Sequence, residues 1–280
     1  MIRLAAAGWA AVLLPEQGGG FASLSLDGVD VLQPLPEGAS PNSGRAGAFV
    51  MLPWCNRLED GRLPWPGGEA RFPINDLPGN NAIHGLSREH PWEVAQQDEA
   101  STQLVQRIDV APFRYDAVLD ASLDAAGLHL ALRVSNRAEG PLPFGLGWHP
   151  WFRRPPGTTL QLRATHRTET DARGLPTAVV PASGVTPADT GWVGRDGQFL
   201  GWDGEAALQL EETRLLLRAR GAWAARAQLF APADRAVVCV EPVSHVTDVA
   251  NRPALAPWGA MALLAPGEAL EGSLSLLRAD

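Results

Sequence analysis

The sequence contains no lysine, so arginine supplies all 23 of its basic residues. The 31 acidic residues outnumber them, which gives a formal net charge of −8 and a pI of about 5.3. The arginines form no basic block that could follow a phosphate backbone. Because nucleic acids and anionic membranes attract proteins through such blocks, we exclude both as main partners.

Cysteine is also rare, with only Cys55 and Cys239 in the chain. Two cysteines are too few for a disulfide framework, and no C-x-x-C or paired His/Cys spacing suggests a zinc site. Free cysteine packs as a small hydrophobic side chain. We therefore predict that both residues are buried in the core.

No apolar run reaches the roughly 18 residues of a membrane span. The apolar run over residues 4–14 has the length of a signal-peptide core, about 7–15 residues. Its basic flank is weak, however, and no A-x-A cleavage site follows it directly. Residues 10–14 and 21–26 are typical of two strands joined by a glycine-rich turn. We expect a first β-hairpin and a cytoplasmic protein, with a signal peptide as the alternative.

Signatures of several enzyme classes are missing. The glycines at positions 18–20 lack the G-x-G-x-x-G spacing and precede no helix, and no Walker A sequence is present. The G-x-S-x-G sequence of a nucleophile elbow is also absent. No internal repeat of fixed period occurs, so a propeller is not supported.

The sequence instead contains many short apolar runs separated by 29 glycines and 24 prolines, a pattern typical of strands joined by turns. Residues 127–136 alternate with period two, which places His129 on the polar face. No long capped helix is evident, although residues 182–192 could hold short helical pieces. We predict one all-β domain over residues 1–280, a sandwich of packed sheets. Further strands are predicted at residues 159–163, 206–210, 214–220, 226–231, 236–240 and 273–277.

The first segment with unusual polar residues holds Arg57, after an apolar Pro-Trp-Cys run, and His84, which precedes a glycine. The arginine fork suits hydroxyl pairs or carboxylates, and the glycine lets another group approach the histidine closely. Both residues also have structural interpretations. Arg57 could pair with Glu59 or Asp60, and His84 could bind a backbone carbonyl in the core.

The second segment is PFGLGWHPWFRR, residues 143–154, in which His149 lies between Trp148 and Trp151. Aromatic rings beside histidine and arginine are typical of a sugar site. The apolar C–H face of a sugar stacks on a ring while its hydroxyls bind the polar groups. A tryptophan-rich edge of the core is the alternative.

The third segment is AVVCVEPVSH, residues 236–245, where Glu241 follows an apolar strand and Pro242 stops its pairing. Such a carboxylate is expected at a partly dry cleft mouth. Partial desolvation would raise its pKa towards a value useful to a general base. A solvated carboxylate at a strand end is the alternative.

These segments, in this order, resemble the aldose 1-epimerase (galactose mutarotase) family. The resemblance covers nearly the whole chain and implies the large β-sandwich, or supersandwich, of that superfamily. The similar motifs are NRL at 56–58, NNAIHG at 80–85, GWHPWF at 147–152, DGQFLGWDG at 196–204, VCVEP at 238–242 and APGEALEGSLSL at 265–276.

The resemblance implies that Glu241 takes the proton of the C1 hydroxyl and that His149 protonates the ring oxygen of the sugar. The ring then opens to the aldehyde, and reclosure gives the other anomer. No metal or organic cofactor is implied, because the reaction only moves protons. The substrate-binding residues implied are His84, Arg57, Asp196 and Trp151, where Trp151 stands at a position usually held by tyrosine.

Several alternatives remain open at the level of sequence. Arg88, Arg153 and Arg154 could bind an anionic group, which keeps a hexose-6-phosphate 1-epimerase as the second candidate. A non-catalytic sugar-binding domain on the same scaffold is the third. His245, four residues after Glu241, could also line the site. The sequence does not name the sugar, and either a monomer or a homodimer is compatible with it.

Overall fold

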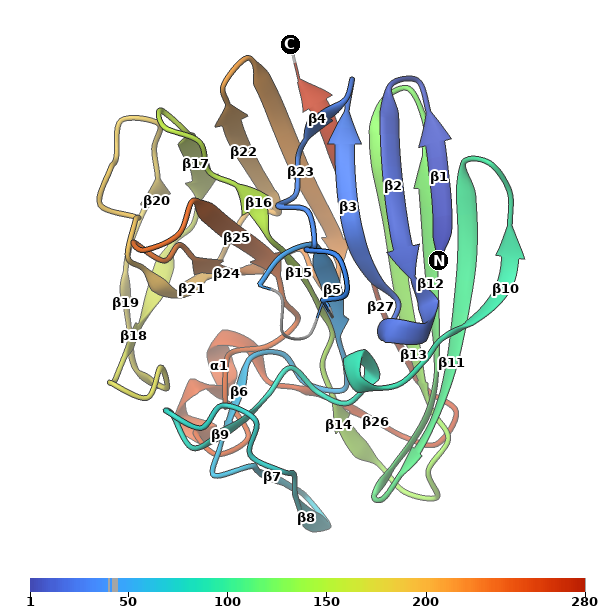
Figure 1. Ribbon diagram of the computed structural model, residues 1–280. Coiled ribbons are helices and arrows are strands. Elements are labelled where there is room, and N and C mark those ends of the chain that lie inside the picture. Colours follow the sequence, from blue (N-terminus) through green and yellow to red (C-terminus); the bar gives the residue numbers. More distant parts are fainter. Residues whose placement is uncertain (40, 42–44, 280) are drawn as a thin grey trace.

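The computed structural model describes residues 1–39, 41 and 45–279, and β-strands make up most of its regular structure (Figure 1). The described helices are short: α1 (Ala256–Gly259) and three 3₁₀ turns, η1 (Pro15–Gln17), η2 (Ser87–Glu89) and η3 (Pro253–Leu255). No helix in this described part is long and apolar enough to cross a membrane. The prediction of an all-β fold is confirmed.

The first sheet begins with the N-terminal strands. Its order is β1-β2-β3-β5-β15, and β4 pairs with β3. The predicted hairpin of residues 10–14 with residues 21–26 is confirmed, because β2 pairs with β3. It is not the first hairpin, however, because the apolar run at residues 4–14 spans parts of β1 and β2, which pair before it. The strands are β1 (Ile2–Ala6), β2 (Trp9–Leu14), β3 (Gly20–Leu26), β4 (Val29–Asp30), β5 (Ala48–Met51) and β15 (Gly147–Pro150).

The second sheet has nine strands in the order β10-β11-β12-β13-β27-β23-β22-β17-β20. In β13 the predicted alternation is confirmed: Leu128, Leu130, Leu132 and Val134 are buried, whereas His129 is partly exposed. The strands are β10 (Glu93–Gln97), β11 (Ser101–Val110), β12 (Phe113–Leu123), β13 (Gly127–Asn136), β17 (Thr159–Arg163), β20 (Gly184–Val185), β22 (Glu205–Leu210), β23 (Thr213–Gly221) and β27 (Ala269–Ala279).

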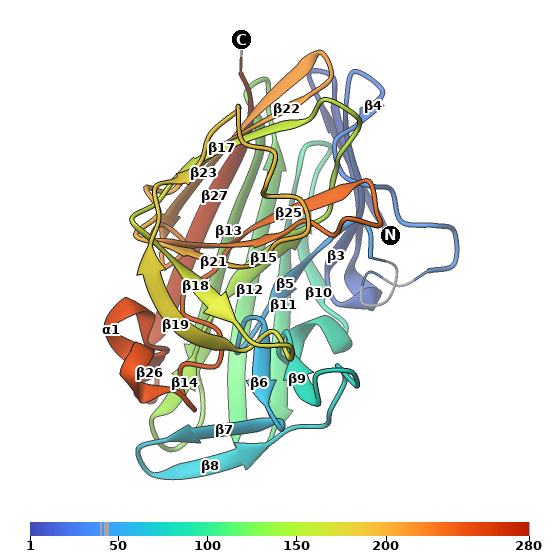
Figure 2. The same ribbon diagram turned by 90° about the vertical axis from the view of Figure 1, so that its left-hand side faces the viewer.

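The third sheet has the order β16-β25-β24-β21-β18-β19, and most of it lies towards the viewer in Figure 2. An antiparallel bridge between Gly147 and Val243 connects its strand β25 region to β15 of the first sheet. The strands are β16 (Phe152–Arg153), β18 (His166–Thr170), β19 (Pro176–Pro181), β21 (Asp196–Leu200), β24 (Arg226–Phe230) and β25 (Val237–Pro242).

Three two-stranded antiparallel sheets complete the described fold, and the pair β7–β8 forms the lower end of the molecule in Figures 1 and 2. One hydrophobic core joins the sheets, because Leu13 of β2, Leu132 of β13 and Leu229 of β24 belong to the same buried cluster. The small pairs are β6 (Arg57–Glu59) with β9 (Asn81–Ile83), β7 (Arg62–Trp65) with β8 (Gly68–Arg71), and β14 (Leu142–Phe144) with β26 (Ala262–Leu264).

Strand predictions are confirmed at 159–163 and, apart from their ends, at the other five positions. The helical pieces considered at residues 182–192 are wrong. That segment contains the short strand β20, in which Val185 pairs with Leu162 of β17. A turn follows, closed by Asp189, whose carboxylate accepts hydrogen bonds from the backbone N–H and hydroxyl of Thr186.

Candidate active site

His149 lies at the junction between the first and third sheets, on β15. Its register partner on β5 is Phe49, and the imidazole stacks on the Phe49 ring with centroids 4.7 Å apart. The ring of Trp151 stacks on the same imidazole at 5.0 Å. Pro150 ends β15 directly after the histidine. These contacts hold the imidazole in one orientation, as a proton-transfer group requires.

Glu241 is the penultimate residue of β25, which ends at Pro242 as the sequence suggested, and it pairs with Gln228 of β24. It is also more buried than a cleft-mouth residue, with only 1% of its surface exposed. Its Oε1 lies 3.3 Å from Nε2 of His149, while its Oε2 has no hydrogen-bond partner among the described residues. The structure thus brings the two predicted proton-transfer groups into direct contact.

Burial shifts the pKa values of both groups towards their neutral forms. Desolvation and the neighbouring negative charge of Asp196 raise the pKa of Glu241 well above its ordinary value, and the positive charge of Arg57 offsets part of this rise. The pKa of His149 falls to about 3 because of desolvation and the positive charges of Arg88 and Arg57. At a pH between the pKa of His149 and the raised pKa of Glu241, the pair holds one proton. Because the two groups are in contact, this proton can lie on either of them.

His84 packs beside this pair. Its ring meets the His149 ring edge-on with centroids 5.0 Å apart, and its Nδ1 lies 2.9 Å from Sδ of Met51. The backbone of His84 is left-handed, with φ of 67°. At the next position, Gly85, a Cβ atom would collide with the Leu52 carbonyl. The glycine therefore lets the Leu52 backbone approach closely, as the sequence predicted. Desolvation and the charges nearby lower the pKa of His84 well below its ordinary value.

Arg57 and Asp196 form an ion pair at the site, with the guanidinium donating a hydrogen bond of 2.8 Å to Oδ2 of the carboxylate. The Nε2 of Gln228 donates a hydrogen bond of 2.6 Å to Oδ1 of the same carboxylate. The alternative pairing of Arg57 with Glu59 or Asp60 is wrong, because both acids bind Arg173 instead. The carboxylate of Asp196 therefore lies fixed between two donors from separate strands.

A cavity of about 280 Å³ joins these groups. All six residues predicted for the site line it, and so does Arg88. The predicted residues lining it are Glu241, His149, His84, Arg57, Asp196 and Trp151. A cavity that combines aromatic rings with a few convergent polar groups can hold a sugar-sized polar ligand.

Three candidates lie outside this cavity lining. His245 is buried, and its Nε2 accepts a hydrogen bond from the backbone N–H of Cys55 while its Nδ1 bonds to the Val246 carbonyl oxygen. The Arg154 guanidinium donates to backbone carbonyls, among them that of Val237. Arg153 lines a separate surface depression. The predicted burial of both cysteines is confirmed, and both are free.

Sequence reasoning missed several residues of the cavity, including Phe49, Asp76 and Gln228. Asp76 lies with its Oδ2 3.7 Å from Nε of Arg57, and Gln228 is the register partner of Glu241. No motif marks these residues. The pairing of β24 with β25 would have identified Gln228, because directly paired residues share one face of a sheet.

The raised pKa of Glu241 has a consequence for stability. Its ionisation opposes folding, so the free energy of unfolding should fall as pH rises from about 4.5 through its raised pKa. Glu241→Gln removes this loss. We compare the melting temperature of the variant with that of wild type at each pH. The difference, variant minus wild type, should be at least about 3 °C larger at pH 8 than at pH 5, since one pKa unit is about 1.4 kcal/mol.

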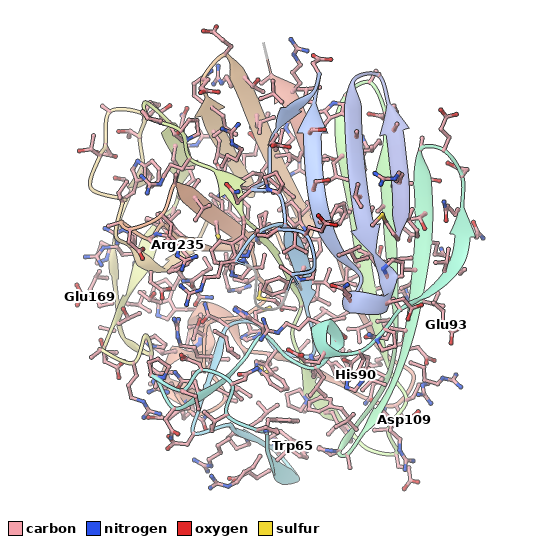
Figure 3. All side chains as sticks on the ribbon, viewed as in Figure 1. Trp65, His90, Glu93, Asp109, Glu169 and Arg235 are labelled. Atoms are coloured by element: carbon pink, nitrogen blue, oxygen red, sulfur yellow. The ribbon has the colours of Figure 1, made fainter. Side chains whose placement is uncertain are left out.

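The matched control for this melting experiment is Glu93→Gln. Glu93 is exposed on β10 and projects outward at the right-hand side of Figure 3, away from the cavity. Its variant should show no such change between the two pH values. Equal pH dependence of melting in Glu241→Gln and wild type would show that burial does not raise the pKa of Glu241.

Known proteins resemble the chain along its whole length. A curated relative, the uncharacterized protein YphB of Escherichia coli K12, is 26% identical over 276 residues, which cover 93% of each chain. The structure of a galactose mutarotase-like protein from Clostridium acetobutylicum superposes with a TM-score of 0.87 at 20% identity, covering 99% of this chain and 94% of the other. A GalM/aldose epimerase homologue from C. elegans gives 0.81 at 16% identity, covering 99% and 98%.

These structural similarities establish the fold, which is that of the galactose mutarotase-like β-sandwiches, as predicted. The sequence profile of the aldose 1-epimerases matches residues 1–276. That match spans every strand that contributes to the cavity, from β5 to β25. The chain therefore belongs to the aldose 1-epimerase family.

Proposed function

We propose that the protein is an aldose 1-epimerase that interconverts the α and β anomers of a free aldose. The observation that carries the proposal is the 3.3 Å contact between Glu241 and His149 at the cavity. Membership of a family that acts on sugars supports the substrate class. The reaction moves protons between O1 and O5, and a carboxylate with an imidazole can perform both transfers.

In the proposed mechanism, the carboxylate of Glu241 takes the C1 hydroxyl proton while the imidazolium of His149 donates a proton to O5. The C1–O5 bond breaks, its electron pair stays on O5, and C1 becomes an aldehyde. The site then holds a neutral carboxyl and a neutral imidazole, which is the form that burial favours. After rotation about C1–C2 the transfers reverse and close the ring on the other face of C1.

The remaining cavity residues position the sugar. Asp196, held by Arg57 and Gln228, retains lone pairs that accept hydrogen bonds from sugar hydroxyls. Neutral His84 lies next to His149 and binds the ring oxygen or a neighbouring hydroxyl. Trp151 offers an aromatic ring at the cavity wall for the C–H face of the sugar.

Polarimetry tests the proposal, using freshly dissolved α-glucose, α-galactose and glucose 6-phosphate. We expect the protein to accelerate the change in optical rotation of at least one neutral sugar in proportion to its concentration. Relaxation at the buffer rate with every sugar, despite measurable sugar binding, would identify a non-catalytic sugar-binding protein instead.

A hexose-6-phosphate 1-epimerase is the second candidate, and Arg45 and Arg88 favour it because both line the cavity. A guanidinium binds phosphate by paired hydrogen bonds. Acceleration with glucose 6-phosphate but with neither neutral sugar would select this function over the first.

The single proton on the Glu241–His149 pair predicts the pH dependence of kcat/KM. The pair keeps that proton from about pH 3, the pKa of His149, up to the raised pKa of Glu241. We therefore expect kcat/KM to be flat between about pH 5 and the upper value and to fall about tenfold per pH unit above it. A steep acidic limb near pH 4.5, the ordinary carboxyl value, would contradict this assignment.

Asp196→Asn is expected to raise KM by about tenfold or more with a smaller effect on kcat. The neutral amide loses the charged hydrogen bonds to sugar hydroxyls, each worth about 1.5–3 kcal/mol. Because these bonds are equally strong in the bound sugar and in the transition state, their loss weakens binding more than it slows the reaction. Initial rates over a range of sugar concentrations measure both constants. Asp109→Asn, on the outer edge in Figure 3, is the control and should change neither constant. An unchanged KM in Asp196→Asn would remove Asp196 from the sugar site.

A further inference from the structure

We propose that the wall of the cavity holds an inhibitory site for a thiophilic divalent metal ion such as Zn²⁺, made by His149 and Glu241, which line the cavity, and by Cys239, which is buried behind them. Each of the three residues offers a ligand atom, and these atoms all lie within 4.8 Å of one another. Nitrogen, thiolate and carboxylate oxygen are the ligand types that zinc prefers. The sequence spacing of these residues gave no such signal, because His149 and Cys239 come from different sheets.

The separation of the histidine and glutamate ligand atoms matches that in a tetrahedral zinc site. Zinc bonds of about 2.0–2.1 Å to nitrogen and 2.0–2.2 Å to oxygen, at the tetrahedral angle, separate the two ligand atoms by about 3.4 Å. Nε2 of His149 and Oε1 of Glu241 are already 3.3 Å apart. Cys239 and Glu241 are two residues apart in β25, so their side chains lie on the same face of the strand. Three protein ligands leave a fourth coordination position for water.

Buried polar atoms of these ligands are also left unsatisfied by the protein. Nδ1 of His149 has no hydrogen-bond partner among the described residues. Oε2 of Glu241 is buried without a partner among the described residues. When the metal binds, the Sγ–H proton of Cys239 and any carboxyl proton of Glu241 pass to the solvent. Binding should therefore strengthen as pH rises.

A metal ion held there occupies both groups that the proposed reaction uses. We expect Zn²⁺ to inhibit anomerisation in competition with the sugar, and a chelator to restore activity. Mg²⁺, which prefers oxygen ligands, should not inhibit at the same concentration. This part of the inference rests on the proposed function, so a spectroscopic measurement is needed beside it.

The experiment uses Co²⁺ as a spectroscopic probe and Zn²⁺ as the inhibitor, on wild type, Cys239→Ser and Cys239→Ala. Wild type should bind one Co²⁺ with a thiolate-to-cobalt charge-transfer band and tetrahedral visible absorption. Both variants should lose the charge-transfer band and bind Zn²⁺ at least about tenfold more weakly. Inhibition of each protein is compared with its own rate without metal. Cys55→Ser is the matched control, because Cys55 is equally buried but belongs to a different core cluster.

The two readouts separate failure of the metal site from failure of the proposed function. A Cys239-dependent Co²⁺ spectrum in a protein without epimerase activity would sustain the site and overturn the enzyme. Epimerase activity with a Co²⁺ spectrum that lacks the thiolate band, or with equal Zn²⁺ affinity in wild type and both Cys239 variants, would overturn the metal site and leave the enzyme standing.

Discussion

Glu241→Gln is expected to lower the rate of anomerisation by at least about 10²-fold. Glutamine has nearly the same shape as glutamate, but its amide cannot take the C1 hydroxyl proton. The strand environment should persist, since the backbone of Glu241 stays paired with Gln228 and its side chain is fully enclosed. Polarimetry gives the rate, and quenching of tryptophan fluorescence by the sugar gives its affinity.

Two results would separate a chemical role of Glu241 from a structural one. The variant should melt no lower than wild type at pH 8, because the buried carboxylate has been removed. Its sugar affinity should change far less than its rate. Glu93→Gln, outside the cavity, should keep the wild-type rate. A near-normal rate in Glu241→Gln would exclude Glu241 as the base.

His149→Ala is the second change with a large expected effect, again at least about 10²-fold. The substitution removes the group that exchanges a proton with O5 and opens a gap between the rings of Phe49 and Trp151. Free imidazole can occupy a gap of this shape. We therefore expect added imidazole to restore part of the rate in this variant and to leave the Glu241→Gln rate unchanged.

The control for the histidine is His129→Ala. His129 is partly exposed on β13, where it contacts Ser275 and Asp124. Loss of these surface contacts should leave anomerisation unchanged. Near-wild-type activity in His149→Ala, without imidazole, would show that another group protonates the ring oxygen.

The sequence identified those site residues that occur in short motifs. His84 precedes a glycine that the backbone requires, and His149 lies among aromatic residues that stack on it. Glu241 follows an apolar run that forms the buried strand β25. In each case the neighbours in sequence create the local environment, so a pattern of a few residues carries the information.

Other features depend on contacts between distant strands, which a local pattern does not encode. Gln228 reaches the site only because β24 pairs with β25 in one register. The burial of Glu241 also depends on the strand that pairs with β25, which neither the apolar run nor Pro242 at the end of β25 specifies. His245 is an error of the opposite kind. Its closeness in sequence to Glu241 suggested a site residue, but both of its ring nitrogens bond to backbone groups.

The segment at residues 182–192 illustrates how pairing overrides a weak local preference. Its one proline and two glycines already disfavour a helix, and pairing of Val185 with Leu162 fixes it at the edge of the nine-stranded sheet. The fold class was predictable from the turn residues and the alternation in β13. The order of the strands in the sheets was not, because pairing between strands far apart in the chain leaves no periodic signal.

The central claim is that the Glu241–His149 pair moves protons at O1 and O5 of a sugar. Exchange spectroscopy by proton NMR, on an equilibrated aldose, tests it without any change in the anomer ratio. Cross peaks between the α and β anomeric protons should appear with wild-type protein and vanish with Glu241→Gln. Exchange at the buffer rate with wild type for every aldose and aldose phosphate, or undiminished exchange in the variant, would contradict the account.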